Sequence, residues 1–213
     1  MNRLPSFVRQ HLAGLRLLLV FTALCGIVYP VVMVGIAQVA FSHQANGSLV
    51  SYHGRVVGSS LLCQEFVNPA NGNPLPQYFQ PRPSAAVPSP APKHDYGCDP
   101  TFSSASNFGP NNPTFVATVR QRLAQVAAFN HVSQAQVPSD AVTASGSGLD
   151  PDISPANAYM QAGRVAAARH VSPAAIRTLV SRFVQGRTLG FLGEPRVNVL
   201  NLNIALDQKY PMP

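Results

Sequence analysis

The chain has 213 residues, a formal net charge of +7 and a hydrophobic fraction of 46%. Charged residues make up only 11%, against about a quarter in typical soluble domains, which excludes a disordered polyelectrolyte. Arg3, Arg9 and Arg16 precede the first apolar segment, so the rest of the chain has only a modest positive excess. We therefore expect no nucleic-acid partner.

The first predicted element is a transmembrane helix over residues 17–41. This segment contains no Asp, Glu, Lys or Arg. As a helix it is about 37 Å long, enough to cross a hydrocarbon core of about 30 Å. It is also longer than the apolar region of a secretory signal, which has about 7–15 residues.

Charge around this segment predicts its orientation. Three arginines precede it, and no Lys or Arg follows it until Arg55. The positive-inside rule then places residues 1–16 in the cytoplasm and 42–213 in an extracytoplasmic domain, on a single pass through the lipid of the cell (inner) membrane. Pro30 removes the helical partner of the Gly26 carbonyl, which predicts a kink. Packing against another membrane protein would satisfy the freed group, and a plain anchor is the alternative.

The extracytoplasmic part begins with a predicted hairpin and a long loop region. Residues 49–52 and 55–62 form two short strands around His53-Gly54. Residues 68–113 are rich in proline, which excludes long helices and central strands there.

Three helices are predicted where a capping residue precedes proline. These starts are Asn112-Pro113, Ser154-Pro155 and Ser172-Pro173. The predicted inward faces are Phe115, Val119, Leu123 and Val126 in the first helix, Ala158, Ala162 and Val165 in the second, and Ile176, Val180, Phe183 and Val184 in the third.

Residues 197–206 fit two structures. Alternation of Leu200, Leu202, Ile204 and Leu206 is typical of a strand, while a helical spacing fits as well. Glu194-Pro195 resembles a helix start and favours the helix. The predicted fold class is therefore a single N-terminal transmembrane helix plus an α+β, loop-rich extracytoplasmic domain.

The residues taken alone indicate no catalytic constellation. The histidines are scattered, and no CxxC or HxxxH spacing predicts a metal site. Asp150-Pro151-Asp152 is interpreted as a turn and cap. The glycine–serine run 143–148 lacks the lysine of a phosphate-binding loop and does not match GxSxG, which leaves a flexible connector or a docking loop.

Arginines and cysteines suggest two further features. Six arginines fall between Arg164 and Arg196, either on solvated helix faces and a loop or on a docking surface for an acidic partner or anion. Cys63 and Cys98 lie in the part predicted to be exported, where disulfides form. We predict that they pair, which would stabilise the domain by about 3–4 kcal/mol.

Several motifs in order make the chain resemble the KdpC family, the C subunits of the bacterial Kdp potassium-transporting ATPase. These motifs are Tyr29-Pro30 through Leu49, Val57–Leu61, Tyr78–Ala85, Ser106–Pro110, Asp140–Pro155 and Gly186–Leu200. Cys63, Cys98 and a longer Pro/Asn stretch at 68–77 depart from the family pattern.

The resemblance implies an accessory, non-catalytic subunit of a high-affinity, ATP-driven potassium uptake complex. Its partners would be a channel-like A subunit, an ATP-hydrolysing P-type B subunit and a small F subunit. The family is described as an assembly factor and as a catalytic chaperone that raises the affinity of the B subunit for ATP. By resemblance, Gln161 is the residue for nucleotide contact, and Arg164 lies on the same helix face.

That nucleotide role conflicts with the predicted topology, because ATP is cytoplasmic and the domain is predicted to lie outside. We give precedence to the topology and expect replacement of Gln161 to leave ATP affinity unchanged. A membrane-anchored exported enzyme and a freestanding anchored binding module are the alternative functions.

Overall fold

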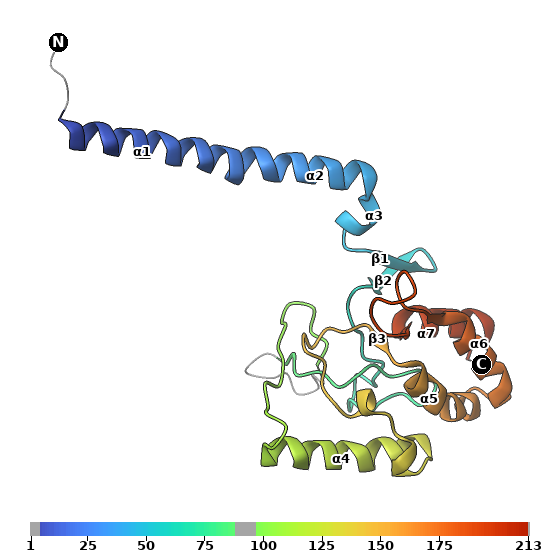
Figure 1. Ribbon diagram of the computed structural model, residues 1–213. Coiled ribbons are helices and arrows are strands. Elements are labelled where there is room, and N and C mark those ends of the chain that lie inside the picture. The colour runs from blue at the N-terminus through green and yellow to red at the C-terminus, as the bar shows by residue number, and fades with distance from the viewer. Residues whose placement is uncertain (1–4, 88–96, 213) are drawn as a thin grey trace. The chain divides into compact units, whose positions relative to one another are not determined.

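The computed structural model describes residues 5–87 and 97–212 and divides the chain into two compact units, Met1–Ser48 and Leu49–Pro213 (Figure 1). Arg3, which contributes to the predicted orientation, and the loop prolines at positions 88, 90 and 92 lie outside the described residues.

The first unit is built on one long helical element. It consists of α1 (Ser6–Ala23), the π-helical turn Leu24–Val28 and α2 (Tyr29–Ala40). Among the described residues, Ser6–Ala40 is the one helix long and apolar enough to cross a membrane, which agrees with the predicted fold class. Its 35 residues extend for about 52 Å. The helix therefore begins well before residue 17 and includes Arg9 and Arg16.

The helix continues through Pro30 by widening just before it. In the π-helical turn, the Tyr29 N–H donates to the Leu24 carbonyl, five residues back rather than four. π-helical turns are rare, and they occur mostly as single turns of this kind inside α-helices. The short helix α3 (Ser42–Ala45) follows, and the Asn46 side chain donates to Gln38 Oε1 over 3.1 Å.

The second unit begins with the predicted hairpin. Strands β1 (Leu49–Tyr52) and β2 (Arg55–Ser59) pair antiparallel, and β2 is shorter than the predicted 55–62. His53 and Gly54 both have positive φ, +49° and +75°. Two such residues are what a tight type I′ hairpin turn requires.

Three helices begin where the sequence predicts. They are α4 (Pro113–Asn130), α5 (Pro155–Ala168) and α6 (Pro173–Phe183), and the side chains of Asn112, Ser154 and Ser172 cap them. Short 3-10 turns at Gln134–Gln136 and Ser139–Ala141 lie between α4 and α5. The described part of 68–113 has no helix before Pro113 and only an isolated bridge between Val67 and Pro74.

Residues 197–206 contain a strand and a helix in succession. Strand β5 (Arg196–Asn198) leads directly into α7 (Val199–Lys209). Glu194-Pro195 does not start the helix, contrary to our prediction. Asn198 is its cap, because its side-chain oxygen accepts from the Asn201 N–H over 3.1 Å. The three-stranded antiparallel sheet has the order β3 (Asp152–Ile153), β5 and β4 (Val184–Gln185).

The core is formed mainly by side chains of α5, α6, α7 and β5. Figure 1 shows these three helices in the domain. The predicted inward residues of α5 are fully buried, as are Ile176 and Val180 of α6. Those of α4 are only half-buried. The largest side chain in the core, Phe79, comes from the proline-rich region rather than from a helix or strand.

Candidate functional site

The segment Leu75–Gln80 contributes Phe79 to the core of the second unit, and we call it the pinned segment. It belongs to no strand, yet the Phe79 side chain is completely buried. Buried backbone N–H and C=O groups need partners, and outside a sheet these must come from elsewhere. The helices α5 and α7 provide them through their side chains.

Two side-chain amides, those of Asn203 and Gln161, hold the end of the pinned segment. We call this pair the amide bracket. Asn203 of α7 accepts from the Phe79 N–H and donates to the Phe79 carbonyl, each over 2.9 Å. Gln161 of α5 does the same for Gln80, over 2.8 Å and 3.0 Å. Each amide thus takes the place of a neighbouring strand for one residue.

Arg164 of α5 binds the first half of the pinned segment. Its guanidinium donates to the carbonyls of Pro76 and Tyr78, to Asn130 Oδ1 and to Gln161 Oε1. It also stacks on the Phe129 ring, 4.3 Å from the centroid. Among the described residues, no carboxylate forms an ion pair with it. Burial lowers the pKa of Arg164, and neutral dipoles alone surround its charge.

Arg169, the residue just after the end of α5, also binds the pinned segment. It donates to the Gln77 carbonyl over 2.9 Å, to the Tyr210 carbonyl over 2.6 Å and to Asp207 Oδ1 over 2.6 Å. The Tyr78 hydroxyl donates to the same carboxylate. Burial, followed by the nearby charge of Asp207, raises the pKa of Tyr78. The pinned segment is therefore tied to both α5 and the end of α7.

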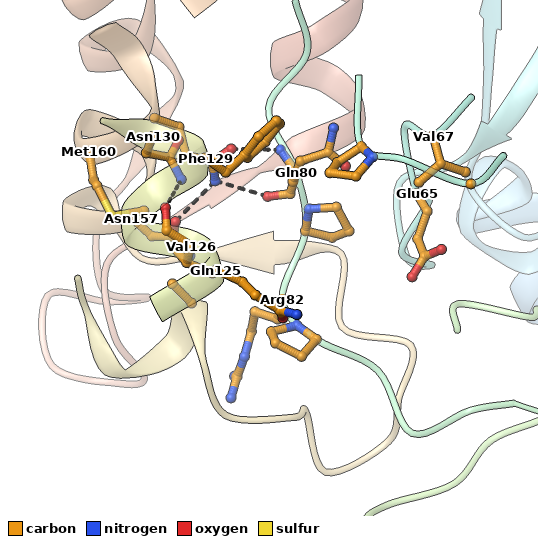
Figure 2. A pocket seen from close by; sticks show the side chains of 16 residues that line it. Glu65, Val67, Gln80, Arg82, Gln125, Val126, Phe129, Asn130, Asn157 and Met160 are labelled. Atoms are coloured by element: carbon orange, nitrogen blue, oxygen red, sulfur yellow. Dashed lines mark hydrogen bonds between the residues drawn. The ribbon is translucent and has the colours of Figure 1, made fainter. Parts of the chain in front are cut away.

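A pocket of about 310 Å³ opens beside the bracket (Figure 2). Its walls come from residues 65–83, from α4 and from α5, and most of the lining is apolar. Pro74, Pro81, Val126, Phe129 and Met160 are among its lining residues. Gln80, Arg82, Gln125 and Asn157 add polar groups, and Figure 2 shows them around one cavity. Such a mixture of apolar walls with a few polar groups is typical of small-ligand sites.

The bracket leaves little room for the nucleotide contact implied by the resemblance. Gln161 uses both amide hydrogens, toward the Gln80 carbonyl and Asn157 Oδ1. Its oxygen accepts from the Gln80 N–H and from Arg164. The two residues are 3% and 4% exposed. In this arrangement they do not fit a phosphate group, because a contact would require breaking the bracket. Their nucleotide role stays a prediction.

The six arginines divide into different environments. Arg164 and Arg169 are buried, so they lie neither on a solvated helix face nor on an exposed docking surface, the two interpretations given above. Arg177, Arg182 and Arg187 are exposed, in agreement with the first interpretation. Spacing carried a signal that we did not use: Asn157, Gln161 and Arg164 recur on the same side of α5 as its buried alanines. Asn203 has the same signal in α7, because it lies four residues after Val199 and three before Leu206, which are both buried.

The two aspartates of the Asp150-Pro151-Asp152 turn also form ion pairs. Asp150 Oδ1 accepts from the Asp152 N–H over 3.0 Å, which is the predicted turn role. Beyond it, Asp150 pairs with Arg82 over 3.0 Å and Asp152 with Arg196 over 3.2 Å. Burial and the neighbouring Asp150 raise the pKa of Asp152.

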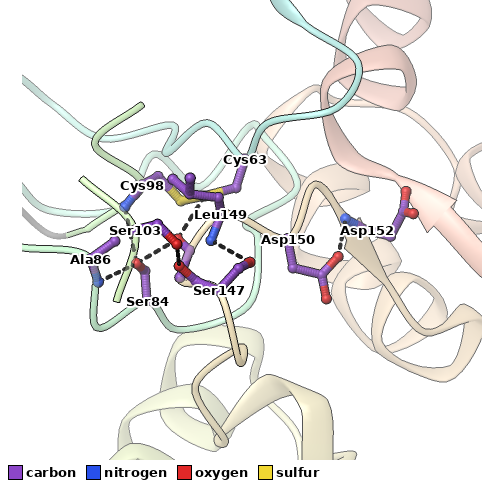
Figure 3. Close-up of a disulfide and its surroundings, with 10 residues drawn as sticks. Cys63, Ser84, Ala86, Cys98, Ser103, Ser147, Leu149, Asp150 and Asp152 are labelled. Carbon is purple, nitrogen blue, oxygen red and sulfur yellow. Dashed lines mark hydrogen bonds between the residues drawn. A yellow bond between two sulfur atoms is a disulfide. The ribbon is translucent and has the colours of Figure 1, made fainter. Parts of the chain in front are cut away.

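The glycine–serine run 143–148 is a packed loop rather than a flexible connector (Figure 3). The Gly148 carbonyl accepts from Ser84 Oγ over 2.7 Å, and the Ser104 N–H donates to the Ser147 carbonyl over 3.0 Å. Gly148 has a φ of +73°, and a Cβ there would lie 2.5 Å from the Cβ of Ala86. Only glycine fits this position.

Cys63 and Cys98 form a disulfide beside this loop, as predicted (Figure 3). The bond joins the chain just after β2 to the start of the second described stretch of the proline-rich region, residues 97–113. The Cys63 N–H donates to the Leu149 carbonyl over 3.0 Å. The disulfide and the glycine–serine loop therefore hold three distant stretches of chain together.

These features define a protein with one long helix that is apolar enough to cross a membrane, followed by a mixed helix-and-sheet domain. Among the described residues, no group of three or more His, Cys, Asp or Glu could hold a metal ion.

The chain belongs to the KdpC family. The family model described as "K+-transporting ATPase, c chain" matches residues 11–208. A relative from Sorangium cellulosum is 51% identical over 91% of this chain and 95% of its own length. Relatives from Caulobacter vibrioides and Kineococcus radiotolerans are 48% and 46% identical over 97% and 98% of this chain, and 95% and 98% of their own lengths. All three are named potassium-transporting ATPase KdpC subunit.

Proposed function

We propose that the chain is an accessory, non-catalytic subunit of an ATP-driven potassium uptake complex. The observation that carries this proposal is family membership along almost the whole chain, from residue 11 to residue 208. The partners would be the channel-like A subunit, the P-type ATPase B subunit and the small F subunit. The single apolar helix suits a subunit that joins its partners within the membrane.

We further propose that the N-terminus is cytoplasmic and that the domain lies outside. Arg9 and Arg16 lie in the first half of the long helix, and the disulfide is of the kind that forms in oxidising compartments. A reporter that is active only outside the cytoplasm, fused after Pro213, should then be active. Activity of a cytoplasm-only reporter at the same position would refute this orientation.

The subunit would act by holding the complex together from outside rather than by binding ATP. Gln161 supports this view, because its hydrogen-bonding groups serve the pinned segment. Any effect on the ATP affinity of the B subunit, the catalytic-chaperone role, would then pass through the span. Such an effect needs two states of the complex with different contacts.

Deleting residues 42–213 while keeping the helix tests the assembly role. We expect the truncated chain to reach the membrane and the complex to dissociate or lose potassium uptake. Co-purification of the four subunits is the measurement, with the full chain as control. If the complex with the truncated chain is intact and fully active, the proposal is contradicted. If the domain has an activity of its own without the other subunits, an anchored enzyme or binding module is favoured instead.

Gln161→Ala in the purified complex tests the nucleotide role. We expect the ATP concentration for half-maximal hydrolysis to stay at the wild-type value when assembly is intact. The control is Thr178→Ala, a substitution at an exposed position of α6, which should also leave this ATP concentration unchanged. A clear rise in that concentration for Gln161→Ala alone, in an intact complex, would support nucleotide contact instead.

A further inference from the structure

The loop between β4 and β5 ends in a tight turn that carries three apolar side chains. Thr188 and Leu192 exchange two backbone hydrogen bonds of 2.9 Å, which leaves three residues at the end of the loop. Leu189 is 79% exposed, Phe191 69% and Leu192 49%. We call Leu189, Phe191 and Leu192 the apolar tip.

Turn geometry does not explain this choice of residues. Leu189 has a φ of +54° and Gly190 a φ of +84°. A bulky side chain in the left-handed region is strained, and glycine or asparagine would occupy the position at lower cost. Core packing does not explain it either, because the side chains are mostly in solvent. A strained and exposed apolar turn indicates a role outside the domain.

The apolar tip lies at the end of the domain where the chain enters from the first unit. Asn198, just after the loop, donates to the Ser60 carbonyl over 2.9 Å, which ties the base of the loop to the end of β2. Figure 1 shows the loop beside β1 and β2. The hairpin and the residues after it add exposed apolar side chains at Leu49, Val56 and Leu61.

Chain length keeps this end of the domain close to the bilayer. The apolar helix ends at Ala40 and β1 begins at Leu49. The intervening residues 41–48, even if fully extended, reach at most about 28 Å, and the helical turn Ser42–Ala45 shortens that reach.

We propose that the apolar tip inserts into the interfacial layer of the same bilayer that holds the helix, as a second membrane contact of the chain. Leucine and phenylalanine are side chains that favour this layer. The contact would be apolar rather than electrostatic, because Arg187, the cation within the loop, is paired with Glu194 over 2.9 Å. This proposal requires that the apolar helix crosses the bilayer. It does not require the accessory role proposed above.

The chain has no tryptophan, so a single one at the tip reports on its surroundings. The probe is Phe191→Trp in the full chain, reconstituted in phosphatidylcholine nanodiscs that contain lipids with a quencher near the headgroup. The matched control is Phe108→Trp, an exposed ring in the loop before α4. We expect the emission of the tip tryptophan to shift to shorter wavelength. It should also be quenched severalfold more strongly than the emission of the control tryptophan, at low and high salt alike.

Adding Leu189→Asn to the Phe191→Trp chain separates insertion from folding. Asparagine tolerates the positive φ and removes one apolar side chain, so the domain keeps its fold while quenching falls. Equal quenching of the tip and control tryptophans would overturn the proposal, as would quenching that appears only with anionic lipid. Shielding of the tip tryptophan only when the other subunits are added would also overturn it and indicate a protein contact instead.

Discussion

The membrane helix and the pinned segment satisfy their backbones in opposite ways. Ser6–Ala40 bonds to itself turn by turn, and none of its helical residues is buried by the rest of the chain. The pinned segment, Leu75–Gln80, depends on side chains of α5 and α7 that lie 81 to 124 positions away in the sequence. Substitutions in the helix should therefore act on partners, while substitutions around the pinned segment should act on the fold of the domain.

The largest effect is expected for Arg164→Met. The change removes the guanidinium donor from the carbonyls of Pro76 and Tyr78 and from Asn130 Oδ1, and it leaves Gln161 Oε1 with one donor fewer. This should lower the free energy of unfolding by about 3–5 kcal/mol. Urea unfolding of the full chain in detergent, followed by circular dichroism, measures this. Arg182→Met on the exposed face of α6 is the control and should change stability by less than about 0.5 kcal/mol. Similar midpoints for both variants would mean that the buried guanidinium is dispensable.

Removal of the disulfide should have the next largest effect. The bond closes a loop with a sequence separation of 35. Its loss in Cys63→Ser/Cys98→Ser should cost about 3–4 kcal/mol, chiefly by freeing the unfolded chain. Mass spectrometry of the unreduced wild type should show the two thiols absent. The control Cys25→Ser should leave stability unchanged. A double variant as stable as wild type would show that the disulfide does not stabilise the domain.

Asn203→Ala tests the amide bracket itself. The Phe79 N–H and carbonyl both lose their partner inside the core, so we expect a loss of about 2–3 kcal/mol. The comparison is with Asn201→Ala, a half-buried asparagine on the same helix, in the same unfolding experiment. If both asparagines tolerate alanine equally, the bracket does not determine the position of Phe79.

The smallest effect on stability is expected for Gly35→Leu in the helix. A Cβ at Gly35 meets nothing within 4 Å in this chain, so the unfolding of the domain should not change. Association with the other subunits should weaken, because small residues allow membrane helices to approach closely. Co-purification yield is the measurement, and Gly14→Leu, equally open, is the control. A complex as stable as wild type would place Gly35 away from any helix contact.

The same contrast explains what the sequence could predict. The span, the hairpin and the three proline-started helices depend on signals within a few residues, and the structure has all of them. In residues 197–206, the alternation of Leu200, Leu202, Ile204 and Leu206 did not indicate a strand, because all four lie in α7. The strand β5 covers only the first two residues of this range, and Asn198 is the cap at which the helix begins. The bracket could not be predicted, because nothing in the local sequence connects Asn203 or Gln161 with residues 79 and 80. Likewise, the packing of Gly148 depends on Ala86 and Ser104 rather than on its neighbours.

The bond from Arg169 to the Tyr210 carbonyl has a consequence for biogenesis. In a chain that leaves the ribosome in order, Phe79 emerges 124 positions before Asn203. At synthesis rates of about 5–20 residues per second, the wait is roughly 6–25 s. During that interval the most deeply buried aromatic ring of the finished domain is in solvent, open to proteases. The last of the Arg169 contacts can form only after Tyr210 has been synthesised, so the pinned segment is completed late.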